Sequence, residues 1–112
     1  MKSTLVRKKI GDKVYKEITQ ERKIKIITDS TYTTDGESIL IIKDSPICNL
    51  FLDSTTTTSI KIKAMTKVSI RPKSSTIDEF YDEVVIERGA CVELEFVENT
   101  WYILSSDGLK LN

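Results

Sequence analysis

The sequence predicts an all-β protein, a small antiparallel β-sandwich or barrel-like knob with an N-terminal β-hairpin or arm. Ile, Val and Thr supply 35 of the 112 residues, whereas Ala supplies two, and β-branched side chains favour strands over helices. Short apolar or alternating segments recur at regular spacing along the chain. Isolated glycines separate several of them, and Asp-Gly or glycine at such points is typical of tight turns.

The chain is long enough for one domain. We expect residues 1–22 to form a basic N-terminal arm or hairpin and residues 23–112 to form the β-rich body. In the arm, Thr4–Lys9 and Val14–Thr19 flank a Gly11-Asp12 turn, which favours a hairpin. An amphipathic helix over Lys13–Lys25 is the alternative.

Further along, eight segments have the length and composition of strands. Their regular spacing predicts a meander. The Thr55–Thr58 run between two of them is predicted to be a connecting loop or strand edge. The eight segments are Ile24–Thr28, Ser38–Ile42, Ile47–Leu52, Ser59–Met65, Lys67–Arg71, Glu83–Arg88, Cys91–Val97 and Thr100–Ser105.

The apolar pattern separates two kinds of strand. Residues 60–63 and 92–96 alternate apolar and charged residues, which is typical of a sheet with one wet face. Three other runs, Ile39–Ile42, Leu50–Leu52 and Trp101–Leu104, are apolar at successive positions, so both strand faces require burial. A sandwich, a barrel or an interface between subunits satisfies that requirement. The candidate core or interface residues are Ile39, Ile41, Leu50, Leu52, Trp101 and Ile103.

Charge is balanced overall and uneven locally. The sequence contains 17 Lys and Arg against 17 Asp and Glu, which argues against a protein that mainly coats nucleic acid. Residues 1–25 carry nine positive and three negative groups, whereas residues 77–98 carry eight negative groups and one positive group. Such a division allows neighbouring copies to attract each other, although two solvated faces of a small domain are the favoured explanation.

No motif for catalysis or cofactor binding stands out. The chain has no His, which removes the usual general base and the commonest metal ligand, so we expect no enzymatic activity, no cofactor and no metal. The two cysteines, Cys48 and Cys91, fit no zinc or redox motif and are expected to be buried free thiols. The carboxylates of Asp78–Glu83 match no calcium loop and favour a solvated acidic loop.

A basic stripe from two adjacent strands is a second candidate surface, formed by Lys61, Lys63, Lys67, Arg71 and Lys73. Without interleaved aromatic residues it gives little support to nucleic-acid binding. No apolar run approaches the roughly 20 residues of a membrane-spanning helix, and no secretory signal is recognisable. We therefore expect synthesis in the cytoplasm, with neither membrane nor nucleic acid as a partner.

From Tyr32 onward, the order of short motifs resembles a domain of bacteriophage virion fibre proteins. The resemblance covers about two thirds of the chain. It departs at Asp53, where the family has proline, and at Glu79, where the family has glycine. It rests on residues 32–41, 48–52, 60–63, 68–72, 76–78 and 99–104, which end in the closing Trp-Tyr-Ile-Leu strand.

The resemblance implies a structural virion protein with a trimeric knob. The short basic N-terminus suggests a head fibre or capsid decoration protein such as those of crAss-like phages, with a tail fibre or tail accessory protein as the alternative. Its partners would be two further copies and other capsid or tail proteins, and the resemblance also allows a host-surface molecule. Made in the host bacterial cytoplasm, it would reside in the virion, attached through Arg7, Lys8, Lys9, Lys13 and Tyr15. A sheet-based nucleic-acid or carbohydrate-binding module is the second alternative.

Overall fold

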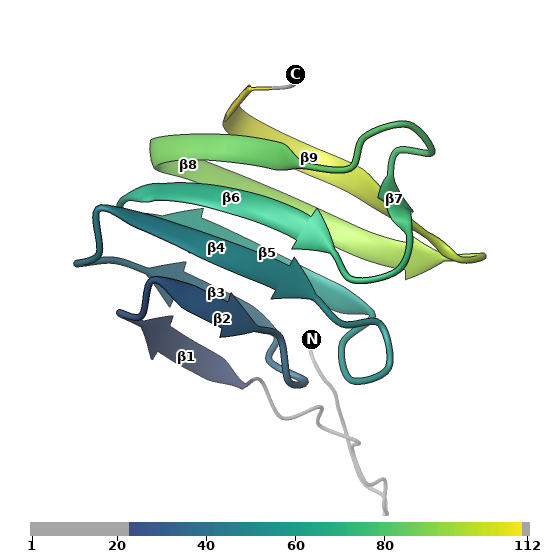
Figure 1. Ribbon diagram of the computed structural model, residues 1–112, viewed down its shortest axis with the longest axis horizontal. Coiled ribbons are helices and arrows are strands. Elements are labelled where there is room, and N and C mark those ends of the chain that lie inside the picture. The colour runs from purple at the N-terminus through teal and green to yellow at the C-terminus, as the bar shows by residue number, and fades with distance from the viewer. Residues whose placement is uncertain (1–22, 111–112) are drawn as a thin grey trace, which may run out of the picture.

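The computed structural model describes residues 23–110, and within that range it contains strands and no helix (Figure 1). The all-β prediction is therefore confirmed. The strands are β1 (Ile24–Ile27), β2 (Thr31–Thr33), β3 (Ile39–Ile42), β4 (Ile47–Leu52), β5 (Ser59–Ala64), β6 (Lys67–Pro72), β7 (Thr76–Ile77), β8 (Val84–Val97) and β9 (Thr100–Lys110).

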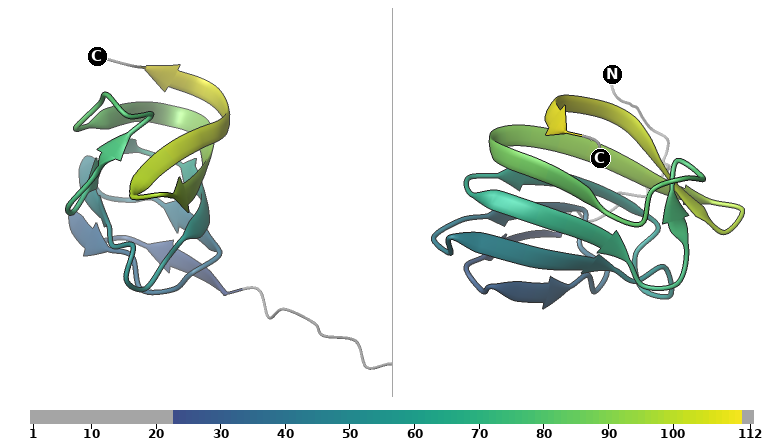
Figure 2. Two further views of the ribbon diagram at one scale, coloured as in Figure 1. Left: turned by 90° about the vertical axis from the view of Figure 1, so that its right-hand side faces the viewer. Right: turned by 45° about the horizontal axis from the view of Figure 1, so that its top comes forward.

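The first six strands form two parallel stacks. β1, β3 and β5 pair in parallel in one stack, and β2, β4 and β6 pair in parallel in the other. In Figure 1 the second stack lies in front of the first, and in the left view of Figure 2 the stacks lie on opposite sides of the molecule. The arrangement is that of a short β-solenoid with three rungs.

Each rung is an arch whose two strands belong to different stacks. Residues 28–30, 43–46 and 65–66 connect β1 to β2, β3 to β4 and β5 to β6, respectively. Neighbouring strands in the sequence therefore face each other through side chains and do not share a hydrogen-bonded ladder. The expected antiparallel sandwich or barrel, built as a meander, does not describe these six strands, because each pairs in parallel with the strand two positions away in the chain.

The hairpin of β8 and β9 covers the last rung of both stacks. β8 pairs antiparallel with β6 through Val84–Ile86. It also pairs antiparallel with β5, from the Cys91–Lys63 pair to the Glu95–Ser59 pair, so one strand joins the two stacks. Between those parts it bends, and Gly89 adopts a φ of 93° there. Because this bend does not end the strand, the two segments predicted at residues 83–88 and 91–97 are a single strand.

The core lies between the two stacks and under the hairpin. Its side chains alternate along the strands: Leu40 and Ile42 point inward from β3, as do Leu50 and Leu52 from β4. Trp101 on β9 is also fully buried and packs at 5.3 Å, centroid to centroid, from the Phe96 ring. Burial of this continuous set supplies the main driving force for folding.

Two strands are absent from the expected set, β2 and the two-residue β7. Both are too short to show a periodicity that can be recognised in the sequence. Most remaining boundaries in residues 23–110 agree to within one residue, and β4 spans the predicted residues Ile47–Leu52. The exception is β9, which continues to Lys110, five residues beyond the predicted end at Ser105. The predicted hairpin within the first 22 residues lies outside the described part of the chain.

Candidate functional site

The six predicted core or interface residues fall into two groups. Leu50, Leu52 and Trp101 are completely or almost completely buried in the core. Ile39 and Ile41 point away from the core and are only half-buried, because they alternate along β3 with the inward Leu40 and Ile42. Ile103 is partly buried against the core.

The outward residues of β3 continue an apolar row from β1. The parallel register places Ile24 beside Ile39 and Ile26 beside Ile41. Ile24 and Ile26 are each 55% exposed, although exposed positions on strands normally carry polar residues. We call these four residues, Ile24, Ile26, Ile39 and Ile41, the isoleucine face.

Charged residues continue the same outer surface beyond the isoleucine face. On β5, Lys61 lies beside Ile39 and Lys63 beside Ile41, and on β8 the partner of Lys61 is Glu93. From the β1 edge toward the hairpin, the surface therefore changes from apolar to basic to acidic.

The predicted basic stripe does not form. Lys61 and Lys63 belong to β5 in one stack, whereas Lys67 and Arg71 belong to β6 in the other. Arg71 forms an ion pair with Glu83, with 3.2 Å between Nη2 and Oε2. Because consecutive strands lie in opposite stacks, no continuous track for a phosphate backbone results.

A cluster of polar side chains lies at the first rung. On β2, the Tyr32 hydroxyl donates a hydrogen bond to the carboxylate of Glu37, which lies in the loop that follows. The Lys25 ammonium lies 3.3 Å from the Tyr32 oxygen and 5.0 Å from the centroid of its ring. Glu37 is only 5% exposed and also accepts a hydrogen bond from the Asp35 amide at 2.8 Å.

These contacts shift the pKa values of Tyr32 and Glu37 in opposite directions. Burial and the neighbouring Glu37 carboxylate raise the pKa of Tyr32 above its ordinary value. Burial also acts to raise the pKa of Glu37, but the hydrogen bonds from Tyr32 and the Asp35 amide outweigh it, so the pKa of Glu37 is lowered. The pair is thus a neutral phenol and a carboxylate near neutral pH, an arrangement that stabilises the loop.

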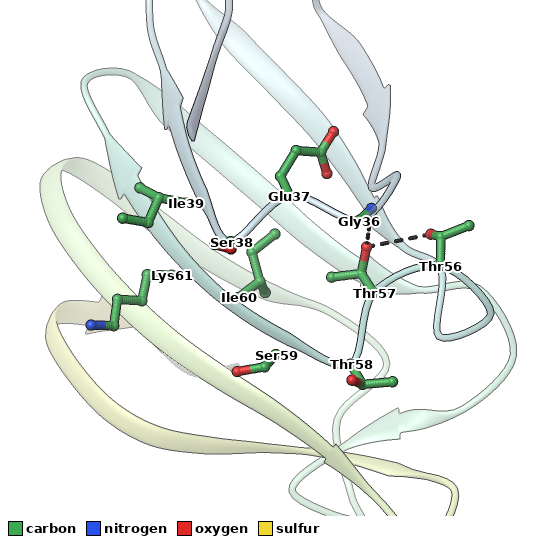
Figure 3. Close-up of a pocket in the computed structure, with 10 residues that line it drawn as sticks. All are labelled: Gly36, Glu37, Ser38, Ile39, Thr56, Thr57, Thr58, Ser59, Ile60 and Lys61. Atoms are coloured by element: carbon green, nitrogen blue, oxygen red, sulfur yellow. Dashed lines mark hydrogen bonds between the residues drawn. The ribbon is translucent and has the colours of Figure 1, made fainter. Parts of the chain in front are cut away.

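A polar groove of about 610 Å³ lies beside this cluster (Figure 3). Its walls are the loop before β3 and the threonine run, which leads into β5. The Thr57 hydroxyl accepts a hydrogen bond from the Gly36 amide at 2.7 Å, and the Thr56 hydroxyl donates to the Thr34 carbonyl at 2.9 Å. The prediction that Thr55–Thr58 form a connecting loop is confirmed.

The groove has little chemistry to offer a substrate. Its carboxylate, Glu37, is already bound by Tyr32 and Asp35, and its most buried hydroxyl, Thr57, is bound by Gly36. No nucleophile is paired with a general base among the groove residues. Thr56 and Thr57 instead tie the loop between β4 and β5 to the loop between β2 and β3.

Three carboxylates of the predicted acidic loop, Asp78–Glu83, bind different protein partners. Asp78 Oδ1 accepts from the Ile103 amide at 3.0 Å, Glu79 Oε2 accepts from the Tyr102 hydroxyl at 2.6 Å, and Glu83 binds Ser69 and Arg71. Within residues 23–110, no three His, Cys, Asp or Glu side chains converge as a metal site would require.

The two cysteines differ in accessibility. Cys48 is completely buried on β4, and burial raises the pKa of its thiol. Cys91 is exposed on β8, so the expectation that both thiols are buried is wrong for it. The reason is register: Cys91 is the partner of the outward residue Lys63.

The predicted attachment residues Arg7, Lys8, Lys9, Lys13 and Tyr15 lie outside the described residues. No helix in the described range is long and apolar enough to cross a membrane. No known protein-family model matches this sequence, and no curated protein is significantly similar to it.

Proposed function

We propose that this chain is a structural protein of a bacteriophage virion, a short head fibre or capsid decoration protein. In this proposal, its basic N-terminal arm attaches to the particle and its β-rich body is displayed as a homotrimeric knob. The role is mechanical, with no catalytic step and no cofactor. The motif order from Tyr32 to Leu104 supports the proposal through its resemblance to virion fibre domains.

The isoleucine face is the structural observation that favours a multi-copy structural role, in a head or a tail fibre, over a binding module that acts as a monomer. A displayed knob made of several copies needs an apolar outer surface, whereas a protein that acts as a monomer rarely exposes clustered large aliphatic residues. Ile24 and Ile26 are each 55% exposed, and they adjoin the half-buried Ile39 and Ile41.

The stacked arches are also suited to a fibre component. In solenoids each rung contacts mainly its neighbours, so such proteins extend along one axis. A tail fibre or tail accessory protein would have the same use for this architecture and is the alternative. A nucleic-acid or carbohydrate-binding module is less favoured, because the lysines and arginine of β5 and β6 lie in opposite stacks.

Analysis of purified particles tests the proposal. We expect the protein to copurify with intact virions in a copy number divisible by three, and with isolated heads once heads and tails have been separated. Recovery with tails would favour the alternative. Absence from virions, combined with salt-dependent binding of the isolated protein to nucleic acid or binding to glycans, would contradict both structural assignments.

A charge reversal tests the attachment arm in the full chain. Replacing Arg7, Lys8 and Lys9 with Glu should abolish incorporation into particles while leaving the circular dichroism of the body unchanged. Replacing Lys67 and Lys73 with Glu is the control, because those exposed lysines belong to the body and lie outside the isoleucine face and its border. Full incorporation of the arm variant would assign attachment to the body.

A further inference from the structure

We propose that the isoleucine face is the surface through which copies of this chain associate. The inference deepens the proposed function, because it assigns the contact that would hold the proposed trimer together. The occupant of the face is a further copy of this chain, and three copies would place their isoleucine faces around a common threefold axis, with Lys61 and Lys63 at the border of each face.

The first argument is the contrast between the two outer surfaces of the solenoid. On the stack of β1, β3 and β5, the first two rungs present four outward isoleucines in a compact two-by-two array. Residues two apart on a strand are about 6.7 Å apart, and neighbouring strands about 4.8 Å. On the opposite stack, the register places Thr31 beside Asn49, and Asn49 beside Ser69. That stack also presents Ile47 and Phe51, but each lies beside a polar or charged residue, Lys67 for Ile47 and Thr33 and Arg71 for Phe51. The array of outward isoleucines is therefore particular to one side.

The second argument is alternation, which shows that the core does not need these residues. Ile27 and Ile42, the inward residues of the same strands, are 2% and 0% exposed, respectively. Since Ile24 and Ile26 point the other way, their burial requires a surface from outside the rung. A second copy brings four matching side chains to the same place.

Charge favours a second copy over the chain's own N-terminal residues as the occupant. Residues 1–22 contain seven Lys and Arg against three Asp and Glu, whereas the isoleucine face is bordered by Lys61 and Lys63, which repel a basic segment. A second copy instead offers Glu93, one strand beyond Lys61. A second copy therefore brings a border in which basic and acidic residues lie side by side, which repels Lys61 and Lys63 less than the basic N-terminal residues do.

Four isoleucines are fewer residues than a specific interface uses, so the contact would include their border. Specific interfaces bury about 800 Å² on each partner, with an apolar centre and a polar rim. The four isoleucines would form the centre. The rim would consist of the aliphatic stems of Lys61 and Lys63 and of the exposed Cys91, which follows Lys63 in the row of Ile41.

Two variants of the full chain test the assignment. Ile26→Lys combined with Ile41→Lys should reduce the mass measured by light scattering to that of one chain, 12.7 kDa. The measurement uses a protein concentration on the order of 50 µM. Because both residues point outward, circular dichroism should be unchanged. The control is Ile47→Lys, which changes an isoleucine 39% exposed at the start of β4 in the other stack and should leave the mass unchanged.

Crosslinking supplies a readout that a folding defect would not imitate. Cys91 is accessible and Cys48 is buried, and the chain has two cysteines, so a short bismaleimide reports on Cys91. We expect crosslinked chains in the wild type and none in the lysine variant. Cys91→Ser combined with Thr31→Cys moves the thiol to the opposite stack and should abolish crosslinking while the mass stays the same.

Three results would overturn the inference: a monomeric wild type, a lysine variant that retains the wild-type mass, or crosslinking that succeeds only through Thr31→Cys. A monomeric wild type would also contradict the proposed trimer, whereas none of the three results decides whether the chain is incorporated into particles. Conversely, association through the isoleucine face without recovery from virions would refute the proposed function and leave the inference standing.

Discussion

At the scale of single residues, alternation along each strand decides whether an apolar side chain is structural or available for contact. Leu40 and Ile41 are neighbours in sequence and have similar hydrophobicity, yet Leu40 is completely buried and Ile41 lies on the outer surface. Substitutions at the two kinds of position should therefore fail differently, inward ones by unfolding and outward ones by loss of association.

Trp101 illustrates the inward kind. Its side chain is 0% exposed and packs against Phe96, so Trp101→Ala should lower the free energy of unfolding by about 3–5 kcal/mol, the usual cost of such a core truncation. Urea denaturation monitored by circular dichroism measures this. Leu104→Ala on the same strand removes a side chain that is 59% exposed and should cost far less. Equal losses would place Trp101 outside the core.

Tyr32 and Glu37 predict how stability depends on pH. The pKa of Glu37 is lowered in the folded state, so its carboxylate adds stability above the unfolded pKa of about 4.3, and this is lost as the pH falls through the folded pKa. The pKa of Tyr32 is raised, so its contribution is complete below its unfolded pKa of about 10 and is lost as the pH rises through the folded pKa.

Tyr32→Phe should therefore lower stability at pH 7 by about 1.5 kcal/mol or more, the usual value of a hydrogen bond to a charged group. It should also move the acid transition to higher pH, because Glu37 loses a donor. Urea titrations at several pH values measure both effects. The control is Tyr102→Phe, whose hydroxyl binds the exposed Glu79. An unchanged acid transition in Tyr32→Phe would show that Tyr32 does not stabilise the carboxylate.

At the scale of elements, the turns carry most of the backbone strain. Asp78 and Glu79 have φ values of 52° and 66°, and the Phe80 amide donates to the Ile77 carbonyl at 3.1 Å, which closes a two-residue turn of the type that favours glycine. The resembling fibre domains have glycine at the position of Glu79. The geometry explains that preference, since only glycine adopts this region freely.

We expect Glu79→Gly to be more stable than Glu79→Ala by about 1 kcal/mol, because the left-handed conformation costs about that much for a residue with a Cβ atom. Both variants lose the hydrogen bond from Tyr102, so their difference isolates the backbone term. Thermal denaturation of the two variants measures it. A more stable alanine variant would mean that the turn does not keep this conformation.

The acidic segment is an element whose behaviour toward cations can be predicted. Because Asp78, Glu79 and Glu83 bind three different protein partners, they do not form the six to eight oxygen ligands that calcium takes. The melting temperature should therefore be the same in EDTA and in excess calcium. A fall of several degrees in EDTA that calcium restores would reveal a cation site.

At the scale of the whole molecule, the rungs differ in how many neighbours support them. β8 pairs with β5, β6 and β9, whereas β2 pairs with β4 alone among the described strands. Since stability in solenoids is approximately a sum over rungs and their contacts, local opening should be easiest at the first rung.

Native-state hydrogen exchange should therefore show faster exchange for amides of β2 than for amides of the central part of β8. β2 is the suitable probe because it lies in the stack opposite the isoleucine face, so association of copies leaves it unchanged. Amides of Leu50 and Ile70, on β4 and β6, should fall between the two extremes. Uniform protection from β2 to β8 would mean that the molecule opens only as a single unit.

The sequence by itself determined the all-β class and most strand positions, because strand composition and turn residues are local signals. It did not determine which side chains of the run Ile39–Ile42 point outward, since every residue of the run is apolar. The sequence also contains an internal repeat, because Ile24–Ser30 and Ile39–Ser45 share five of seven residues. Such repeats indicate solenoids.

Only the tertiary structure decided which strands pair. The apolar run Ile39–Ile42 can satisfy a meander or a stacked arch equally well, since both bury its inward face. The choice depends on contacts distant in sequence, such as the pairing of Ile39 with Ile24 and Lys61. That pairing also creates the isoleucine face, because it brings together residues that are fifteen positions apart; local composition has no means of specifying such a surface.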